Sequence, residues 1–174
     1  MKFLRKKRLV IALDVALNKS GLAILSTEGD VLHTELIKVT PGWKYYQKIE
    51  YLYNEYLKLF DAVLTAKPAY SILVLEGRLK AGWSGTTLAS IEGARITSFL
   101  AYYSTCQRHE KDVNVISYDP NDVKHFISGK RAAKKEELKQ KALSQFTCLS
   151  GVDYQEDIYD AIYLALRHID TMKE

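Results

Sequence analysis

The sequence is poor in the features that mark secreted, zinc-binding and membrane-spanning proteins. Its two cysteines, Cys106 and Cys148, fit neither a disulfide framework nor the ligand spacing of a zinc site, and both lie among apolar residues as small core side chains do. No apolar run approaches the length of a transmembrane helix. The run at residues 9–13 follows a basic start, as in a signal peptide, but Asp14 ends it too early. These absences predict a protein of a reducing cytoplasm with no membrane association.

Internal repeats and low-complexity linkers are also absent, so we expect a single domain over residues 1–174. Hydrophobic residues make up 47% and charged residues 26%, as is usual for a globular protein. The net charge of +4 is compatible with a polyanionic partner. Basic residues gather in two clusters, for which solvated surface is the default explanation. The clusters comprise Lys2, Arg5, Lys6, Lys7 and Arg8, and then Lys130, Arg131, Lys134, Lys135, Lys139 and Lys141.

The hydrophobic pattern predicts an α/β fold. Strands are expected at residues 9–13, 22–25, 31–39, 70–75 and 113–118, and helices at 45–66, 86–107, 120–127, 134–146 and 155–172. Asp119-Pro120 supplies an N-cap and a first-turn proline for the third helix. The first helix is rich in tyrosine, for which half-buried packing is favoured over a stacking platform for bases. The order of elements predicts a mixed five-stranded sheet, three antiparallel strands then parallel strands, with helices on both faces.

Two carboxylates stand at the ends of predicted strands. Asp14 directly follows the buried run 9–13, where an isolated carboxylate is costly unless it meets a partner, a metal ion or a wet cleft. A capping role in the following turn would explain Asp14 equally well. Glu76 follows the strand at 70–75, at the edge where ligands collect in open α/β sheets. Alone, Glu76 is weak evidence, because strand ends face water in any protein.

Asp157 and Asp160 lie three residues apart on the last predicted helix, so they share a face. The helix dipole would explain an acid in the first turn, but Asp160 lies further in, beside apolar residues. Carboxylates gathered at one sheet edge repel each other unless cations lie between them. Hard oxygen ligands select Mg²⁺, with Mn²⁺ as a substitute. Two such ions per site, about 4 Å apart, can hydrolyse a phosphodiester. The pattern predicts a magnesium-dependent nuclease whose catalytic and metal-binding residues are Asp14, Glu76, Asp157 and Asp160.

Three segments carry a family resemblance, namely VIALDVALNKSGLAIL, LVLEG and QEDIYDAIYLALRHI. They resemble the RuvC family of Holliday junction resolvases, and its compact phage-encoded members in particular, over almost the whole chain. The resemblance implies an RNase H-like fold, and it matches Asp14, Glu76, Asp157 and Asp160 to the carboxylates of the family. The chain departs from bacterial members, which usually follow the first Asp with Pro-Gly, in having Val15-Ala16.

The same resemblance implies a surface that contacts DNA. After Glu76 the family has a loop with an aromatic and basic residues, and here a gap-free alignment puts Leu79 at the aromatic position, with Trp83 four residues on. Packing of Trp83 against the following helix is an equal alternative. Two separated lysines of the family that contact phosphate match Lys124 and Lys135. The implied DNA-binding residues are Arg78, Lys80, Trp83, Lys124, Lys130, Arg131, Lys134 and Lys135.

The resemblance therefore implies a metal-dependent, structure-selective endonuclease that nicks branched DNA and resolves Holliday junctions by symmetric phosphodiester hydrolysis. It also implies a homodimer, flaps and forks as further substrates, no nucleotide cofactor and, for a phage-encoded member, the cytoplasm of a bacterial host. One alternative is an RNase H-type hydrolase of RNA–DNA hybrids. Another is a catalytically silent module that binds branched DNA, against which four intact carboxylates argue. Actin-like kinases also open with a strand-borne Asp, but they need a second similar domain.

Overall fold

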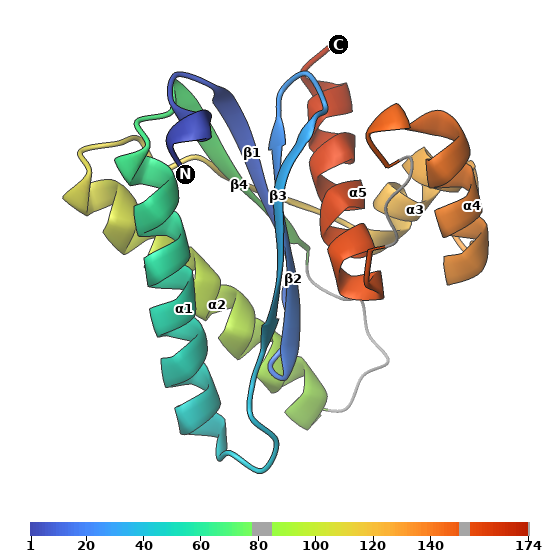
Figure 1. Ribbon diagram of the computed structural model, residues 1–174. Coiled ribbons are helices and arrows are strands. Elements are labelled where there is room, and N and C mark those ends of the chain that lie inside the picture. Colours follow the sequence, from blue (N-terminus) through green and yellow to red (C-terminus); the bar gives the residue numbers. More distant parts are fainter. Residues whose placement is uncertain (78–84, 150–153, 174) are drawn as a thin grey trace.

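A computed structural model describes residues 1–77, 85–149 and 154–173, and its five strands form one mixed sheet in the order β3-β2-β1-β4-β5 (Figure 1). The strands are β1 (Arg8–Asp14), β2 (Lys19–Ser26), β3 (Val31–Lys38), β4 (Tyr70–Glu76) and β5 (Val115–Tyr118). The helices are α1 (Tyr45–Thr65), α2 (Gly85–Arg108), α3 (Pro120–Ser128), α4 (Lys135–Gln145) and α5 (Glu156–Thr171), with short 3₁₀ turns at Lys2–Leu4 and Thr147–Leu149.

The topology confirms the predicted α/β fold class. β1 pairs with β2, and β2 with β3, in antiparallel order. The turn between β2 and β3 contains Gly29, whose φ of +99° favours glycine. β4 lies parallel to both β1 and β5, and the helices α1 and α2 make the crossover connections that parallel strands require.

The sheet lies between two helical layers, with α1 and α2 on one face and α5, backed by α3 and α4, on the other (Figure 1). Because successive side chains of a strand point to opposite faces, β1 divides its residues between two cores. Leu9, Ile11 and Leu13 pack in the core under α1 and α2. Val10 and Ala12 pack in the core under α5. This alternation decides which way the residues at the strand ends point.

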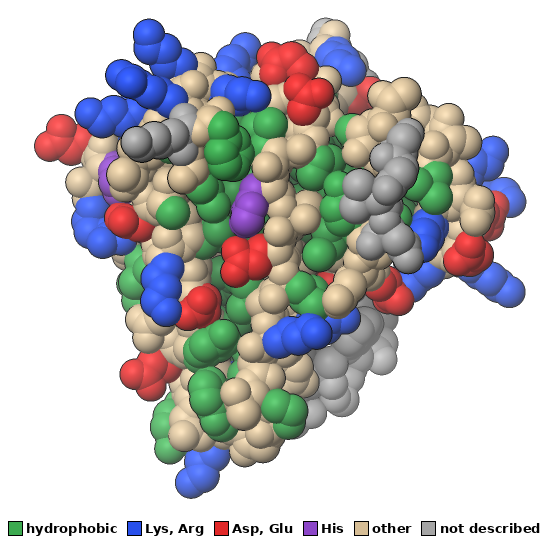
Figure 2. Space-filling model, in the orientation of Figure 1, with side chains coloured by type: hydrophobic (Ala, Val, Ile, Leu, Met, Phe, Trp, Pro, Cys, Tyr) green, Lys and Arg blue, Asp and Glu red, His purple; other side chains and the backbone are tan. Residues whose placement is uncertain are grey.

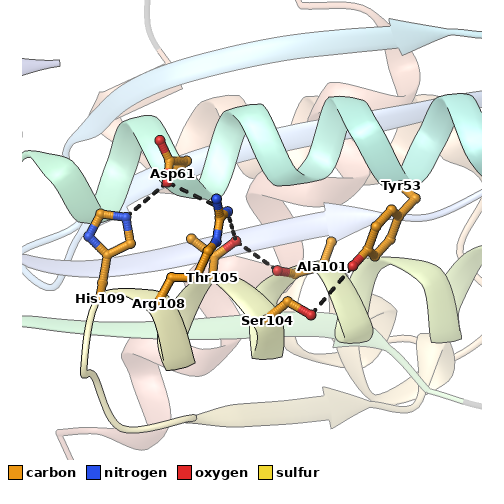
Figure 3. Close-up of polar contacts among 7 residues, drawn as sticks. All are labelled: Tyr53, Asp61, Ala101, Ser104, Thr105, Arg108 and His109. Carbon is orange, nitrogen blue, oxygen red and sulfur yellow. Dashed lines mark hydrogen bonds and ion pairs between the residues drawn. The ribbon is translucent and has the colours of Figure 1, made fainter.

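Polar contacts fix α1 on α2 (Figure 3). Asp61 of α1 accepts a bond from the His109 ring nitrogen at 2.9 Å and lies 3.6 Å from the Arg108 guanidinium. The hydroxyls of Tyr53 and Ser104 lie 3.4 Å apart. These contacts join α1 to α2 along the line where the two helices meet.

The tyrosine-rich helix α1 packs as the half-buried interpretation requires. Tyr56 is fully buried, and Tyr51 and Tyr53 are half-buried, whereas Tyr45 and Tyr46 are 49% and 61% exposed. Asp119 caps α3 as predicted, since its carboxylate accepts the backbone N–H of Asn121 at 2.8 Å.

One cysteine differs from expectation. Cys106 is fully buried, but Cys148 is only half-buried because it lies in the short 3₁₀ turn after α4, at the edge of the core under α5. In the residues that the structure describes, no helix is both long and apolar enough to cross a bilayer.

Candidate active site

Asp14 and Glu76 end the neighbouring parallel strands β1 and β4. Leu13 pairs with Leu75, so the two carboxylates follow at the same level of the sheet. Asp14 continues the alternation of Val10 and Ala12, and Glu76 that of Val74, so both point to the face covered by α5.

The helix α5 places Asp157 and Asp160 near Asp14 at the same end of the sheet. Its first turns cross β2 at Gly21, which pairs with Asp14 in the sheet. A Cβ atom at Gly21 would lie 1.9 Å from the carbonyl oxygen of Asp157 and 2.8 Å from the backbone nitrogen of Ile158. Only glycine allows this approach, so Gly21 sets the distance between the carboxylates of α5 and Asp14.

These elements enclose a cleft of about 390 Å³. Asp14, Glu76 and Asp160 supply its acidic groups, and Lys124 and Lys135 its basic ones. Asp157 stands beside the cleft rather than in its lining. The remaining lining residues are Val15, Ala16, Ile91, Pro120, Val123, Leu138, Tyr163 and Leu164. The cleft thus combines charged groups of both signs with apolar walls.

The carboxylates of the cleft influence each other's titration. The pKa of Asp14 is raised to about 8, first by burial and then by the negative charges of Asp160, Glu76 and Asp157. The pKa of Glu76 is raised to about 7 by burial and by Asp160, while Lys124 and Lys135 oppose the change. Burial also raises the pKa of Asp160, which Lys135 partly offsets. Asp14 therefore lies within electrostatic reach of the three other predicted carboxylates.

Two lysines form ion pairs with the carboxylates of α5. Lys135, at the start of α4, pairs with Glu156 and lies 3.8 Å from Asp160. Lys19, at the start of β2, pairs with Asp157. Lys19 was missed in the sequence, although its position two residues before Gly21 puts it on the face of β2 that α5 covers.

The four carboxylates supply hard oxygen donors only, which suits magnesium better than zinc. In the part of the chain that the structure describes, no three acidic, histidine or cysteine side chains already stand together as ligands of one ion. Lys19 and Lys135 hold two of the carboxylates instead. Burial, and after it the charges of neighbouring carboxylates, still raise the pKa values of Asp14 and Glu76 in the presence of these lysines. The residues thus fit a divalent cation in chemistry and in charge, once Asp157 and Asp160 turn from the lysines toward it.

The residues predicted to contact DNA fall into three groups: some line the cleft, some are exposed beside it, and some lie outside the described residues. Lys124 and Lys135 line the cleft. Lys130 pairs with Glu137 at 2.7 Å and Arg131 with Asp122 at 3.7 Å, both on the exposed surface of α3 and α4. Lys134 is exposed just before α4. In Figure 2 basic and acidic side chains lie next to one another over α3 and α4. Arg78, Lys80 and Trp83, together with Leu79, lie outside the described residues.

No protein-family model matches the chain. Among curated proteins it is similar to the crossover junction endodeoxyribonuclease RuvC of Thermotoga maritima, with 27% identity over 165 residues that cover 91% of this chain and 89% of that protein. RuvC of Thermotoga petrophila is 26% identical over 165 residues, covering 91% of this chain and 90% of that protein.

The solved structures agree. Thermus thermophilus RuvC in complex with a Holliday junction substrate has a TM-score of 0.77 at 18% identity, covering 95% of both chains. The yeast mitochondrial Holliday junction resolvase Ydc2 has a TM-score of 0.60 at 10% identity, covering 98% of this chain and 82% of that one. At these identities the likeness shows the fold. The expected resemblance to the RuvC family is confirmed: the chain is similar to RuvC in sequence over most of its length, and it has the RNase H-like fold of RuvC.

Proposed function

We propose that the protein is a metal-dependent endonuclease that nicks branched DNA and resolves four-way junctions. The observation that carries this proposal is the cleft in which Asp14, Glu76 and Asp160 meet Lys124 and Lys135. Its carboxylates suit cations, and its lysines suit phosphate. The relatives named as crossover junction endodeoxyribonucleases supply the substrate class. We place the activity in the cytoplasm, where bacterial DNA lies.

Asp14, Glu76, Asp157 and Asp160 would hold the metal, which we propose to be two magnesium ions per site, replaceable by manganese. Bound magnesium supplies the Lewis acidity that activates water and stabilises the leaving oxygen. Asp14 and Glu76 come from the rigid ends of two paired strands, so they anchor the ions. Asp157 and Asp160 come from α5, and each would have to break its ion pair with a lysine before it could bind the metal.

Lys124 and Lys135 would bind the phosphates that flank the scissile bond. Each lies in the cleft lining next to the carboxylates. The exposed residues Lys130, Arg131 and Lys134 extend this positive surface away from the cleft. Contacts to phosphate carry no base information, so we expect recognition of branch shape more than of sequence. Arg78, Lys80 and Trp83 remain expected contacts from the loop after Glu76.

We propose a homodimer that presents two clefts to the two symmetric strands of a junction. An exposed apolar stripe on α2 offers a surface for it. Phe99 and Tyr103 have ring centroids 6.2 Å apart at its centre. The side chains of the stripe are each 38–52% exposed, and they are Leu88, Ile96, Phe99, Leu100 and Tyr103. Their helical spacing puts them on one face, as a partner helix would require.

Nicking of a synthetic four-way DNA junction, with magnesium and with a chelator, tests the proposal. The wild type should cut only with the metal. Asp160→Asn should abolish cutting and still bind the junction, because it removes a metal ligand without removing a phosphate contact. Asp170→Asn is the matched control on the same helix, since Asp170 pairs with Arg167 outside the cleft.

Assays on different nucleic-acid substrates distinguish this function from the two alternatives. Cutting of an RNA–DNA hybrid in preference to the junction would assign the cleft to an RNase H-type activity. Junction binding without cutting in magnesium or manganese would identify a silent binding module. Cutting by Asp160→Asn at the wild-type rate would refute the site.

A further inference from the structure

A buried pair of hydroxyl groups lies beneath the loop that follows Asp14. Tyr56 of α1 is fully buried, and its hydroxyl donates to Ser20 Oγ at 2.9 Å. Ser20 is fully buried at the start of β2 and points to the α1 face. Its hydroxyl donates to the carbonyl oxygen of Ala16 at 3.0 Å and accepts the N–H of Ala16 at 3.2 Å.

These three bonds use the full capacity of the Ser20 hydroxyl, which has one donor and two acceptor sites. Ala16 is two residues beyond Asp14, so the bonds hold the chain where it leaves β1. The far end of the same loop is also tied down: Lys48 of α1 donates to the Asn18 side chain at 2.6 Å, and Asn18 O accepts from Val39 at 3.0 Å. The loop from Asp14 to Lys19 is thus fastened to α1 at both ends.

We propose that Tyr56 and Ser20 are positioning residues for the metal site, which hold Asp14 in place through the backbone of its loop. The proposal rests on the proposed function, because it takes Asp14 as a metal ligand. Asp14 points to the α5 face and Ser20 to the α1 face, so the pair acts without touching the ligand. Neither Ser20 nor Tyr56 lines the cleft.

The position of Asp14 in the cleft explains why such a support is needed. Asp14 lines the cleft together with Glu76 and Asp160, and the three carboxylates can share metal ions only if each keeps a fixed place. A loop with free backbone groups would let Asp14 move relative to the other two. Groups that orient a metal ligand from behind typically change metal affinity or activity by about 10–100-fold when they are removed. We expect the lower end of that range, because Ser20 still binds Ala16 when the tyrosine hydroxyl is lost.

The chain contains a matched control. Tyr102 of α2 is also fully buried, and its hydroxyl lies 3.1 Å from the hydroxyl of Ser71, again between a helix and a strand. Ser71 stands at the beginning of β4, whereas Glu76 and the cleft stand at its end. Tyr56→Phe and Tyr102→Phe therefore remove the same group from similar surroundings at opposite ends of the sheet.

The experiment measures Mn²⁺ binding by calorimetry without DNA, junction cutting, and the melting temperature for each variant. Tyr56→Phe should weaken Mn²⁺ binding about tenfold and slow cutting, while Tyr102→Phe leaves both unchanged at a similar loss of stability. The proposal would be overturned if the two variants changed Mn²⁺ binding equally. It would also be overturned if Tyr56→Phe bound Mn²⁺ as tightly as the wild type.

A second pair of variants keeps the test decisive if Tyr56→Phe folds poorly. Ser20→Ala removes the hydroxyl that holds Ala16, and Ser20→Thr retains it. Metal affinity should fall in Ser20→Ala and return in Ser20→Thr, whereas a purely structural role would show only in the melting temperatures. A wild type that binds no Mn²⁺ and cuts no junction would instead refute the proposed function, and this proposal with it.

Discussion

Replacement of Gly21 by alanine tests how the site is assembled, because it changes neither a charge nor a proposed ligand. Gly21 pairs with Asp14 in the sheet and lies directly under the first turn of α5. The new methyl group would point at the backbone of Asp157 and Ile158. Backbone atoms cannot swing aside as a side chain can, so α5 must move or β2 must bend.

The size of the movement follows from the contact. The Cβ would lie 1.9 Å from the Asp157 carbonyl oxygen, and an ordinary carbon–oxygen contact is about 3.3 Å, so the two must separate by about 1.4 Å. Forced overpacking lowers the free energy of unfolding by about 1–3 kcal/mol. Replacing glycine by alanine also restricts the unfolded chain, which raises that free energy by about 0.4–1 kcal/mol. A misplacement of about 1 Å at a reacting centre can cost about 100-fold in rate. Activity should therefore suffer far more than folding.

Single-turnover cutting of a four-way junction and thermal melting measure the two effects. We expect the rate to fall about 100-fold and the melting temperature to fall by about 2–8 °C. Gly85→Ala is the control, because a Cβ there meets no atom within 4 Å. A Gly21→Ala protein that melts lower but cuts within threefold of the wild-type rate, about 0.7 kcal/mol in activation free energy, would show that the approach of α5 does not set the site.

Three further predictions address the charges of the cleft. Lys135→Ala should weaken junction binding and reduce the magnitude of the slope of log K against log[salt] by about one unit. An unchanged slope would show that Lys135 makes no contact with phosphate. Lys19→Gln should lower the magnesium concentration for half-maximal cutting by about twofold to fivefold, because an ammonium ion no longer competes for Asp157, whereas the neighbouring Lys38→Gln should not. In a chelator, the folded protein holds a proton on Asp14, whose pKa is raised from 3.8 to about 8, so stability should fall as the pH rises from 4 through 8. Asp14→Asn should flatten that dependence in urea melts, and an equal pH dependence in both proteins would contradict the assignment.

Most of the fold could be predicted because its elements carry strong periodicity. The buried run of β1 contains apolar residues only, and that of β4 adds a single serine, Ser71. In α1 the apolar residues recur at helical spacing. The direction of Asp14 and Glu76 could also be inferred, since alternation along a strand fixes it once one face is known. Asp160 stood out because it interrupts an otherwise apolar face of α5.

The supporting residues could not be predicted, because their roles depend on contacts between distant segments. Ser20 and Tyr56 are 36 residues apart, and neither is unusual in its own segment. Lys19 belongs to a turn where lysine is common, and only the position of α5 gives it a carboxylate partner. The choice between Leu79 and Trp83 for the aromatic position of the loop after Glu76 remains a prediction, since both lie outside the described residues.

The charges of the cleft explain why carboxylates and lysines occur together in it. Four carboxylates face three lysines, namely Lys19, Lys124 and Lys135, and Glu156 also pairs with Lys135, so the lysines do not fully balance the carboxylates of the protein without metal. A site built only to bind phosphate would gain nothing from Asp14 or Glu76, because both would repel the backbone of DNA. Two bound magnesium ions would instead reverse the sign of the local charge and release Lys19 and Lys135 from Asp157 and Asp160. The same ions that permit hydrolysis would then make lysines available to phosphate, so metal binding and DNA binding should strengthen each other.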